Sequence, residues 1–153
     1  MTAQSLLTEP PVRYASGEMI LLVEDDEHDA FFMQRALRKA RPDLSMRLAS
    51  DGEQAPDYLN ARGDFANRIA NPPPSIIFLD LKLPYISGFQ VLEHLRAARL
   101  PNPAPVFILT SSSEDRDRSR ALELGAKGYF VKPPTPEMLL QVLGPSALHA
   151  HPP

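Results

Sequence analysis

Acidic side chains and one lysine stand at the ends of three separate apolar runs in this 153-residue chain. They are Glu24, Asp25 and Asp26 after residues 19–23, Asp80 after residues 76–79, and Lys132 after residues 129–131. Carboxylates within a few ångströms of one another repel, and a hard divalent cation with oxygen ligands relieves that repulsion. Magnesium suits such a site because it binds through one or two carboxylates and leaves positions for phosphate oxygens. These residue types therefore predict a magnesium-dependent phosphoryl site.

Asp80 is the expected nucleophile of this site. A carboxylate oxygen that attacks phosphorus forms an aspartyl phosphate, and the transfer depends mainly on positioning and on neutralisation of charge. Lys132, the Thr110 hydroxyl and the Ser111 backbone amide are the candidates for contacts to the phosphoryl oxygens. Taken singly, an acid or a threonine at such a junction often caps a helix, and a lone lysine is usually solvated. Asp26 is expected to be a helix cap only, and the hypothesis rests on the joint pattern.

Apolar periodicity predicts the elements that must bring these residues together. The expected strands are residues 19–23, 44–48, 76–80, 106–110 and 129–131, and the expected helices are residues 27–41, a short helix near Tyr58, 88–98, 114–124 and 136–143. Strands that alternate with helices form a parallel sheet with helices on both faces, and right-handed crossovers restrict the strand order. We predict a single α/β domain with a doubly wound, flavodoxin-like (βα)5 parallel sheet of strand order 2-1-3-4-5.

The predicted strand order decides where the functional residues meet. It places the first and third strands side by side at the topological switch point, so Glu24 and Asp25 lie next to Asp80 at the carboxyl edge of the sheet. The strand over 44–48 alternates apolar and polar residues, which is typical of a strand with one wetter face, and it falls at the sheet edge. The connection over 61–75 contains three consecutive prolines and is expected to be irregular.

Composition and charge exclude several other classes of function. The 16 basic and 19 acidic residues give a net charge of −3 with no basic stripe, so nucleic-acid binding is not expected. Cysteine is absent, which removes disulfides, thiolate zinc sites and thiol nucleophiles. No apolar stretch approaches the roughly 20 residues of a membrane span, so we expect a cytoplasmic protein without membrane contact. The folded domain is expected over 18–143, between a flexible extension at 1–17 and a Pro- and His-containing tail at 144–153.

Four motifs resemble, in order and in spacing, the receiver domain of bacterial response regulators. They are ILLVEDD at 20–26, FLDLKLPYISG at 78–88, ILTSS at 108–112 and GYFVKP at 128–133. The resemblance covers about residues 19–143. The run ILLVEDDEHDA, the long Pro-rich second crossover, and DLKLP followed by SGFQVLEHLR are most similar to stand-alone receivers that serve phytochrome-type and hybrid histidine kinases.

The resemblance implies how a metal ion and a phosphoryl group are bound. Asp80 matches the phosphoacceptor, and Asp25 matches the direct Mg²⁺ ligand. Glu24 matches the partner acid that usually works through water, and Lys82 holds the place whose backbone carbonyl binds the metal. Lys82 also puts a cation two residues after the nucleophile, which leaves the phosphoryl lifetime open.

The resemblance also implies how the site responds to phosphorylation. Thr110 matches the hydroxyl that swings toward the phosphoryl group, Tyr129 the aromatic residue that changes rotamer with it, and Lys132 the lysine that pairs with the phosphate. Pro133 matches a proline that usually follows a cis peptide bond. Packing explains Tyr129 equally well when it is taken alone, so its role as a switch rests on its neighbours.

Apolar residues on two helices are candidates for partner contacts. Phe31, Phe32 and Met33 are consecutive and cannot all face the core of one helix. Receivers dock their kinases partly through this helix, which makes Phe31 and Phe32 candidate contacts. The short last helix has more apolar residues than one face holds, so Met138 and Leu139 are candidates for a partner or for a second subunit at the fourth-helix to fifth-helix face. Core packing is the alternative for each of them.

The leading hypothesis is a single-domain two-component response regulator. It would accept a phosphoryl group on Asp80 from a histidine kinase or a phosphotransfer protein, and it would act through protein contacts. It is not expected to be an enzyme beyond catalysis of its own phosphorylation and dephosphorylation. One alternative is a receiver-fold adaptor that is not phosphorylated. Another is an aspartyl-phosphate phosphohydrolase of the haloacid dehalogenase type, which would need an acid where Lys82 stands.

Overall fold

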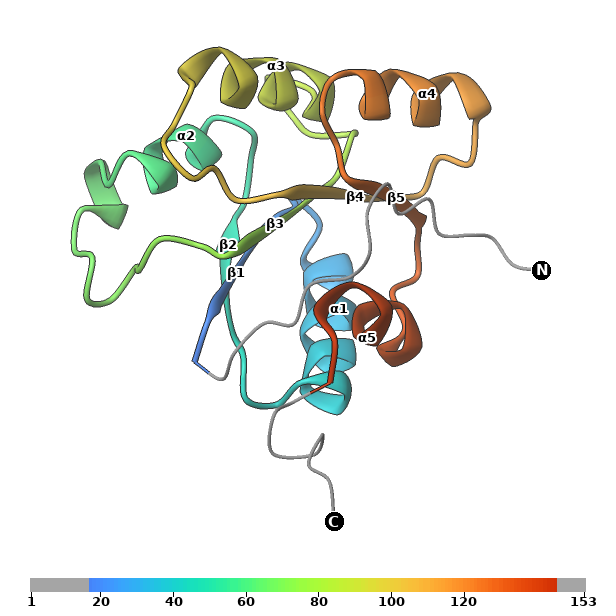
Figure 1. Cartoon of the computed structure of the whole chain (residues 1–153), viewed down its shortest axis with the longest axis horizontal. Helices are drawn as coiled ribbons and strands as arrows, with labels where there is room; N and C mark the ends of the chain where they lie inside the picture. Colours follow the sequence, from blue (N-terminus) through green and yellow to red (C-terminus); the bar gives the residue numbers. More distant parts are fainter. Residues whose placement is uncertain (1–16, 146–153) are drawn as a thin grey trace.

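Five parallel strands form one sheet in the computed structural model, which describes residues 17–145 (Figure 1). The strands are β1 (Met19–Val23), β2 (Ser45–Ala49), β3 (Ile76–Leu79), β4 (Val106–Thr110) and β5 (Gly128–Val131). Their order across the sheet is β2-β1-β3-β4-β5, and every neighbouring pair is parallel. The predicted flavodoxin-like order is therefore confirmed.

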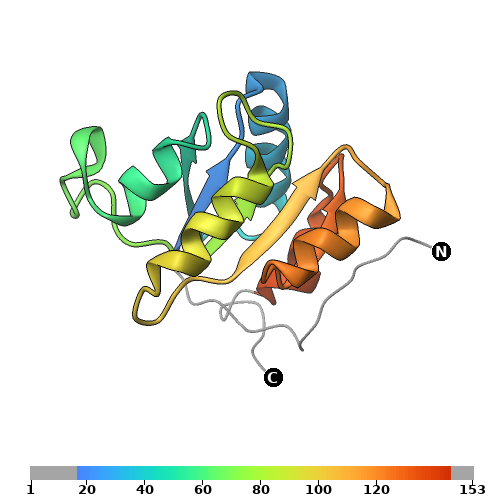
Figure 2. The same ribbon diagram turned by 90° about the horizontal axis from the view of Figure 1, so that it is seen from above.

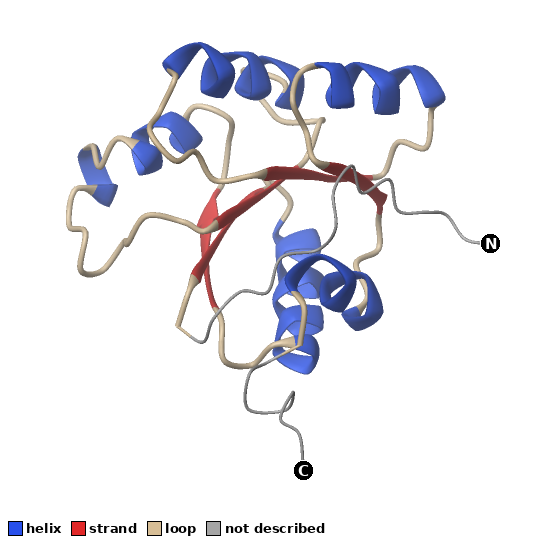
Figure 3. Ribbon diagram, viewed as in Figure 1, coloured by secondary structure: helices blue, strands red, loops and turns tan. Residues whose placement is uncertain are grey.

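The helices cover both faces of the sheet (Figure 1, Figure 2). One face carries α1 (Glu27–Ala40) and α5 (Pro136–Leu143), and the other carries α2 (Gln54–Leu59), α3 (Gly88–Ala98) and α4 (Asp115–Glu123). A 3-10 turn, η1 (Gly63–Phe65), lies in the connection between α2 and β3. Figure 3 shows the resulting three layers, with the sheet between two layers of helices. The predicted doubly wound architecture is present.

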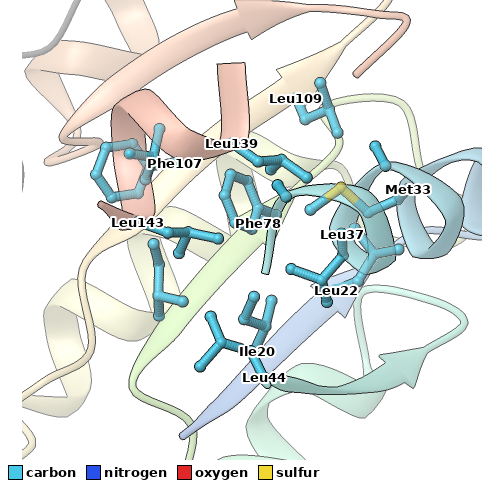
Figure 4. Close-up of a cluster of buried hydrophobic side chains, with 14 of the residues drawn as sticks. Ile20, Leu22, Met33, Leu37, Leu44, Phe78, Phe107, Leu109, Leu139 and Leu143 are labelled. Atoms are coloured by element: carbon cyan, nitrogen blue, oxygen red, sulfur yellow. The ribbon is translucent and has the colours of Figure 1, made fainter. Parts of the chain in front are cut away.

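Alternate side chains of each central strand enter two separate hydrophobic clusters. Ile20 and Leu22 of β1 and Phe78 of β3 pack with residues of α1 and α5 (Figure 4). Leu21 and Val23 of β1 belong to the second cluster, which contains residues of α2, α3 and α4. Because successive strand residues point to opposite faces, a strand covered on both sides must be apolar throughout. β1, β3 and β4 are buried along their whole length, and this burial holds the strand ends that carry the polar residues.

The edge strand β2 departs in one respect from its predicted pattern. It pairs with β1 alone, as expected for an edge. Leu44 is buried and Met46 packs against the core, which fits the predicted apolar face. Leu48, however, is 39% exposed although it lies opposite the buried Leu22. A strand with no outer neighbour covers its apolar residues incompletely, so the predicted face is only partly buried.

α1 begins at the residue that its capping pattern predicted. The Asp26 carboxylate accepts hydrogen bonds from the backbone amides of His28 and Asp29, which satisfies donors that a helix start leaves unpaired. The buried face of α1 consists of Ala30, Met33, Ala36, Leu37 and Ala40. Phe31 and Phe32 are 59% and 47% exposed. Both phenylalanines are therefore available at the surface of α1.

α5 ends after two turns, as predicted, but one of its residues was assigned to the wrong face. The chain leaves the helix at Gly144, whose φ is +74°. The expectation that Leu139 contacts a partner is wrong, because its side chain is fully buried in the core. Met138 is partly buried against the same cluster. Leu140, which is 38% exposed, is instead the large apolar residue that this helix presents to solvent.

Three further expectations concern loops and chain ends. The peptide bond before Pro133 is cis, as the resemblance implied. Gly125 follows α4 with a φ of +109°, a conformation that favours glycine and is common just after a helix end. The expected extension at 1–17, apart from Gly17, lies outside the described residues, and so does the expected tail beyond Pro145. Within 17–145, no helix is long and apolar enough to cross a membrane.

Candidate functional site

Pairing of β1 with β3 brings the predicted acids together. Val23 lies opposite Leu79, and the Asp80 amide donates to the Val23 carbonyl at 3.1 Å. The residues that follow these strand ends therefore meet at the same edge of the sheet. One carboxylate oxygen from each of three residues lies within 4.8 Å of the others, and these residues are Glu24, Asp25 and Asp80. We refer to these three residues as the acidic cluster.

The acidic cluster combines buried and exposed ligands. Glu24 and Asp80 are buried, whereas Asp25 is exposed. All of the donor atoms are carboxylate oxygens, which are the ligands that Mg²⁺ prefers, and the exposed side leaves room for its waters. The residues therefore fit a hard divalent cation. The resemblance assigned a further metal contact to the backbone carbonyl of Lys82, and that assignment stays a prediction.

Lys132 reaches the cluster from the end of β5. Its ammonium lies 2.7 Å from Glu24 Oε1, 2.8 Å from Asp29 Oδ2 and 2.9 Å from Asp80 Oδ2. The Lys132 amide donates to the Thr110 carbonyl at 2.8 Å, which ties the loop after β5 to the end of β4. Burial disfavours the charged ammonium, but its hydrogen bonds to Asp29, Glu24 and Asp80 outweigh burial and raise the pKa of Lys132.

Asp29 is a member of this network that sequence reasoning missed. It lies in the first turn of α1, and its carboxylate is about one third exposed. A local signal was present, because Asp29 comes three residues after the cap Asp26, on the turn nearest the carboxyl edge of the sheet. The pattern did not reveal which way the carboxylate points, since that depends on the rotation of α1 about its axis.

Glu24 is the buried acid of the cluster. Burial raises its pKa to about 7, and the nearby Asp80 charge acts in the same direction. The hydrogen bond from Lys132 opposes this shift. The Asp26 amide donates to Glu24 Oε2 at 3.2 Å, which fixes the carboxylate relative to the start of α1. A bound divalent cation would favour the ionised form of Glu24.

Thr110 carries a buried hydroxyl without a partner. Its side chain is fully buried at the end of β4, and among the described residues Oγ1 has no hydrogen-bond partner. A buried polar group is normally hydrogen-bonded, so an unpaired one is a candidate for a ligand contact. Ser111, the next residue, is exposed. This arrangement fits the predicted contact between Thr110 and a phosphoryl oxygen, and that contact stays a prediction.

Tyr129 is held in a buried position behind the site. Its side chain is 1% exposed, and its hydroxyl donates to the Ser112 carbonyl at 2.9 Å. The Arg118 guanidinium lies 5.3 Å from the centroid of the Tyr129 ring, within cation–π range. Burial raises the pKa of the Tyr129 hydroxyl. The residue predicted as a switch is therefore bonded to the β4–α4 loop, one residue beyond Ser111.

The β3–α3 loop holds the other side of Asp80. The Lys82 amide donates to Asp80 Oδ1 at 3.2 Å, while the Lys82 side chain is exposed. Gly88, the first residue of α3, donates its amide to the Leu81 carbonyl at 2.9 Å. A Cβ atom added at Gly88 would overlap the Asp80 carbonyl oxygen and would lie 2.7 Å from Leu81 Cα. The Lys82 amide therefore contacts the Asp80 carboxylate, and Gly88 packs closely against the Asp80 backbone.

Comparison with known proteins identifies the family model that this chain matches. Residues 20–144 match the response regulator receiver domain. Among solved structures, the bacteriophytochrome response regulator RtBRR is 40% identical with a TM-score of 0.71, over 81% of this chain and 74% of that chain. The Mn²⁺-bound form of response regulator Rcp1 is 32% identical with a TM-score of 0.66, over 76% of this chain and 81% of that chain.

Curated relatives give a consistent result over different lengths. Rcp1 of Synechocystis sp. is 32% identical over 115 residues, which are 75% of this chain and 76% of that protein. The phosphate regulon transcriptional regulatory protein PhoB of Escherichia coli is 39% identical over 87 residues, which are 57% of this chain. The matched region spans 36% of the length of PhoB.

Proposed function

This chain belongs to the response regulator receiver domain family, and from this membership we propose that Asp80 accepts a phosphoryl group in a Mg²⁺-dependent reaction. One observation carries the proposal above the others. The Asp80 carboxylate is buried at the sheet edge, within 4.8 Å of two further acids and 2.9 Å from a lysine ammonium. A buried carboxylate next to a metal-binding set and a cation is suited to attack phosphorus and to hold the product.

The proposed reaction is a transfer from a phosphorylated histidine. An Asp80 carboxylate oxygen forms a bond to phosphorus while the bond from phosphorus to the histidine nitrogen breaks, and the leaving imidazole takes up a proton. Mg²⁺ bound by the acidic cluster would neutralise charge that develops on the phosphoryl oxygens. Lys132 would donate to one phosphoryl oxygen from its place beside Asp80. The Thr110 hydroxyl and the Ser111 amide are the proposed donors to the others.

A histidine kinase is the proposed phosphoryl donor. The similar structure RtBRR is a bacteriophytochrome response regulator, which supports a phytochrome-type kinase as the first partner to test. A hybrid kinase and a phosphotransfer protein are the other proposed donors. Phe31 and Phe32 are the proposed contacts, because both are exposed on the helix that starts beside the acidic cluster. Their rings form an edge-to-face pair with centroids 5.7 Å apart. A docked kinase helix could cover both rings at once.

Signalling is proposed to proceed through a change in the balance between two states. Phosphorylation would draw the unpaired Thr110 hydroxyl toward the phosphoryl group and would loosen the bond between Tyr129 and the Ser112 carbonyl. α4 and α5 lie on opposite faces of the sheet, and the surface that they form together at its β5 edge is the proposed α4–α5 face (Figure 1). This face would then change its affinity for a partner or for a second copy of this chain. Leu140 and the partly buried Met138 are the apolar residues that α5 offers there.

The deciding experiment is phosphorylation by a small-molecule donor. The protein is incubated with acetyl phosphate and Mg²⁺, and intact mass is followed for the addition of one phosphoryl group. We expect an adduct that requires Mg²⁺, that is absent in Asp80→Asn and that persists in Asp64→Asn, a control at an exposed acid of η1. Absence of any adduct in the folded protein, together with no binding of beryllofluoride, would favour the adaptor function instead.

A further inference from the structure

Lys132 uses all of the donors of its ammonium group, and its acceptors come from three different elements. The ammonium has three N–H groups. The three carboxylates at 2.7, 2.8 and 2.9 Å are Glu24 after β1, Asp29 in α1 and Asp80 after β3. The lysine side chain itself is 11% exposed. Its position is therefore decided by the balance among these three acids.

The three acids would differ in their contacts once a metal ion and a phosphoryl group are bound. The acidic cluster, which could hold a metal ion, contains Glu24 and Asp80 but not Asp29. Under the proposed function, a metal ion engages Glu24, and the phosphoryl group occupies an oxygen of Asp80. Asp29 is then the carboxylate beside Lys132 that neither the metal ion nor the phosphoryl group engages.

From this asymmetry we propose that Asp29 is a positioning residue that holds the Lys132 ammonium beside the phosphoryl site. The proposal deepens the function proposed above and rests on it. Asp29 does not touch the reacting atoms, and it acts through Lys132. Its carboxylate keeps the flexible lysine stem in one arrangement while a second N–H of the ammonium donates to a phosphoryl oxygen. A charged hydrogen bond of this length favours one geometry over the many open to a free lysine.

The start of α1 is built to hold Asp29 in place. The Asp29 amide donates to Asp26 Oδ1 at 3.0 Å, and the Ala30 amide donates to the Asp26 carbonyl at 3.0 Å. Ala30 and Met33, which follow in the next turn, are buried in the core. The carboxylate is thus carried by a capped and anchored helix turn. The same helix carries Phe31 and Phe32, the proposed kinase contacts.

The Asp29 charge has two opposing effects on anion binding: it positions Lys132, and it repels the phosphoryl group. As a negative charge near the phosphoryl group, Asp29 would weaken anion binding if its contact with Lys132 contributed nothing. The Asp29 carboxylate is 37% exposed, compared with 3% for Glu24, so solvent screens its charge more strongly at a distance. At 2.8 Å from the ammonium, direct contact dominates. We therefore expect removal of this charge to weaken binding of a phosphoryl mimic.

The first test reads Lys132 directly in the metal-free protein that carries Glu24→Gln and Asp80→Asn, so that Asp29 is the remaining charged acceptor among the three acids that contact Lys132. The further variants of this first test are made in this background. The side-chain ¹⁵N–¹H signal of a lysine ammonium is retained when the group is held in ion pairs and is broadened by exchange when it is free. We expect the Lys132 signal, assigned by its loss in Lys132→Met, to broaden in Asp29→Asn and to be retained in Asp29→Glu. A signal unchanged in Asp29→Asn would overturn the proposal, because Lys132 would then be held without Asp29.

The second test measures beryllofluoride affinity in the presence of Mg²⁺ by titration calorimetry. Asp29→Asn should weaken it about three- to tenfold, the size expected of a partly screened charged hydrogen bond. Asp29→Glu should restore most of the loss, and the loss should vanish when Asp29→Asn is made in Lys132→Met. The control is Glu27→Gln, which removes the same charge from an exposed position on the same helix turn.

The outcomes separate this proposal from the proposed function. Equal or tighter binding in Asp29→Asn would overturn the positioning role, and so would the same weakening in the Lys132→Met background. If the wild-type chain bound no beryllofluoride and took up no phosphoryl group, the proposed function would fail. The ammonium signal of the metal-free protein would still decide whether Asp29 holds Lys132. Melting curves of Asp29→Asn and Asp29→Glu establish that both variants are folded.

Discussion

At the scale of single residues, the acidic cluster couples protonation to folding through Glu24. Its pKa is raised to about 7 by burial, from an ordinary value of 4.5. A group whose folded pKa is raised stabilises the fold fully below its unfolded pKa, and that contribution is lost as the pH rises through the folded pKa. Above pH 7 the metal-free protein therefore holds an ionised, buried carboxylate beside Asp80, and Lys132 compensates for it only in part.

We predict that the free energy of unfolding of the metal-free protein falls as the pH is raised from about 5 to about 8. Glu24→Gln should remove most of this slope, because an amide does not titrate. Mg²⁺ should stabilise the protein more at pH 8 than at pH 6, since it binds the ionised carboxylate. Urea unfolding at several pH values, with and without Mg²⁺, measures both effects. An equal slope in Glu24→Gln would show that another group is responsible.

Lys82 carries a second prediction at this scale. Its exposed side chain starts two residues after Asp80, next to the amide that bonds Asp80 Oδ1. A cation there can contact the phosphoryl group and hinder an attacking water, so Lys82→Ala should shorten the phosphoryl lifetime about two- to fivefold, the size expected of an exposed charge contact. Decay of the adduct is followed by intact mass, with the exposed Lys39→Ala as control. An unchanged decay rate would mean that Lys82 only faces solvent.

At the scale of elements, Arg41 joins the end of α1 to the end of α5. Its side chain is fully buried, and its guanidinium donates to the carbonyls of Leu143 and Gly144 at 3.1 and 2.9 Å. The same group donates to both carboxylate oxygens of Asp43 at 2.9 and 2.8 Å. The last carbonyls of a helix have no partner within the helix. Arg41 supplies one for α5, which is only 8 residues long.

We predict that Arg41→Ala lowers the free energy of unfolding by about 3 kcal/mol, because it leaves buried carbonyls and the Asp43 carboxylate without the guanidinium. Arg38→Ala, at an exposed position of α1, should change it by less than about 0.5 kcal/mol. Urea unfolding of the three proteins measures the difference. A small effect in Arg41→Ala would indicate that water replaces the guanidinium and that α5 does not depend on this bond.

The turn from β3 into α3 carries a prediction about the site itself. A Cβ at Gly88 would overlap the Asp80 carbonyl oxygen, and backbone cannot move aside as a flexible side chain can. We predict that Gly88→Ala lowers stability by about 1–3 kcal/mol through overpacking and also slows phosphorylation by acetyl phosphate. Glu93→Ala, at an exposed position of the same helix, should leave both unchanged. If Gly88→Ala had the stability and the phosphorylation rate of the wild type, the loop would relax without moving Asp80.

At the scale of the whole molecule, the sheet decides where the acidic cluster lies relative to the helices. The acidic cluster lies at one edge of the sheet, where β1 and β3 end. α1 and α5 pack against each other on one face, while α4 lies on the other face beside β5 (Figure 1). α5 starts a few residues after Lys132, so the proposed site and the last helix are joined by a short segment of chain. Leu140 is the large apolar residue that α5 exposes.

We predict that Mg²⁺ and beryllofluoride together raise the fraction of dimer through the face that α4 and α5 form. Burial of Leu140 and part of Met138 would provide the apolar contact. Light scattering after size exclusion measures the mass over a range of concentrations, and Leu140→Glu should lower the dimer fraction. A mass near 17.0 kDa in both states at every concentration would contradict the prediction.

Local patterns in the sequence were sufficient for the order of the elements and for the meeting of Glu24, Asp25 and Asp80. β1 and β3 are buried apolar runs that acids follow directly, and parallel strands place these ends on one edge of the sheet. The sequence also predicted Asp26 as a helix cap, because capping depends on residues only two and three positions away. The length of α5 followed from Pro136 and Gly144, which act locally.

Tertiary structure alone decided the contacts that depend on how each helix is rotated and where its ends lie. Lys132 and Asp29 are separated by 103 positions, and they meet only because α1 turns the Asp29 side chain toward the end of β5. The same kind of rotation buries Leu139 and leaves Leu140 at the surface, which no count of apolar residues in α5 could decide. Periodicity defines a helix face, but only packing against the sheet selects which residues of that face reach the core and which reach the site.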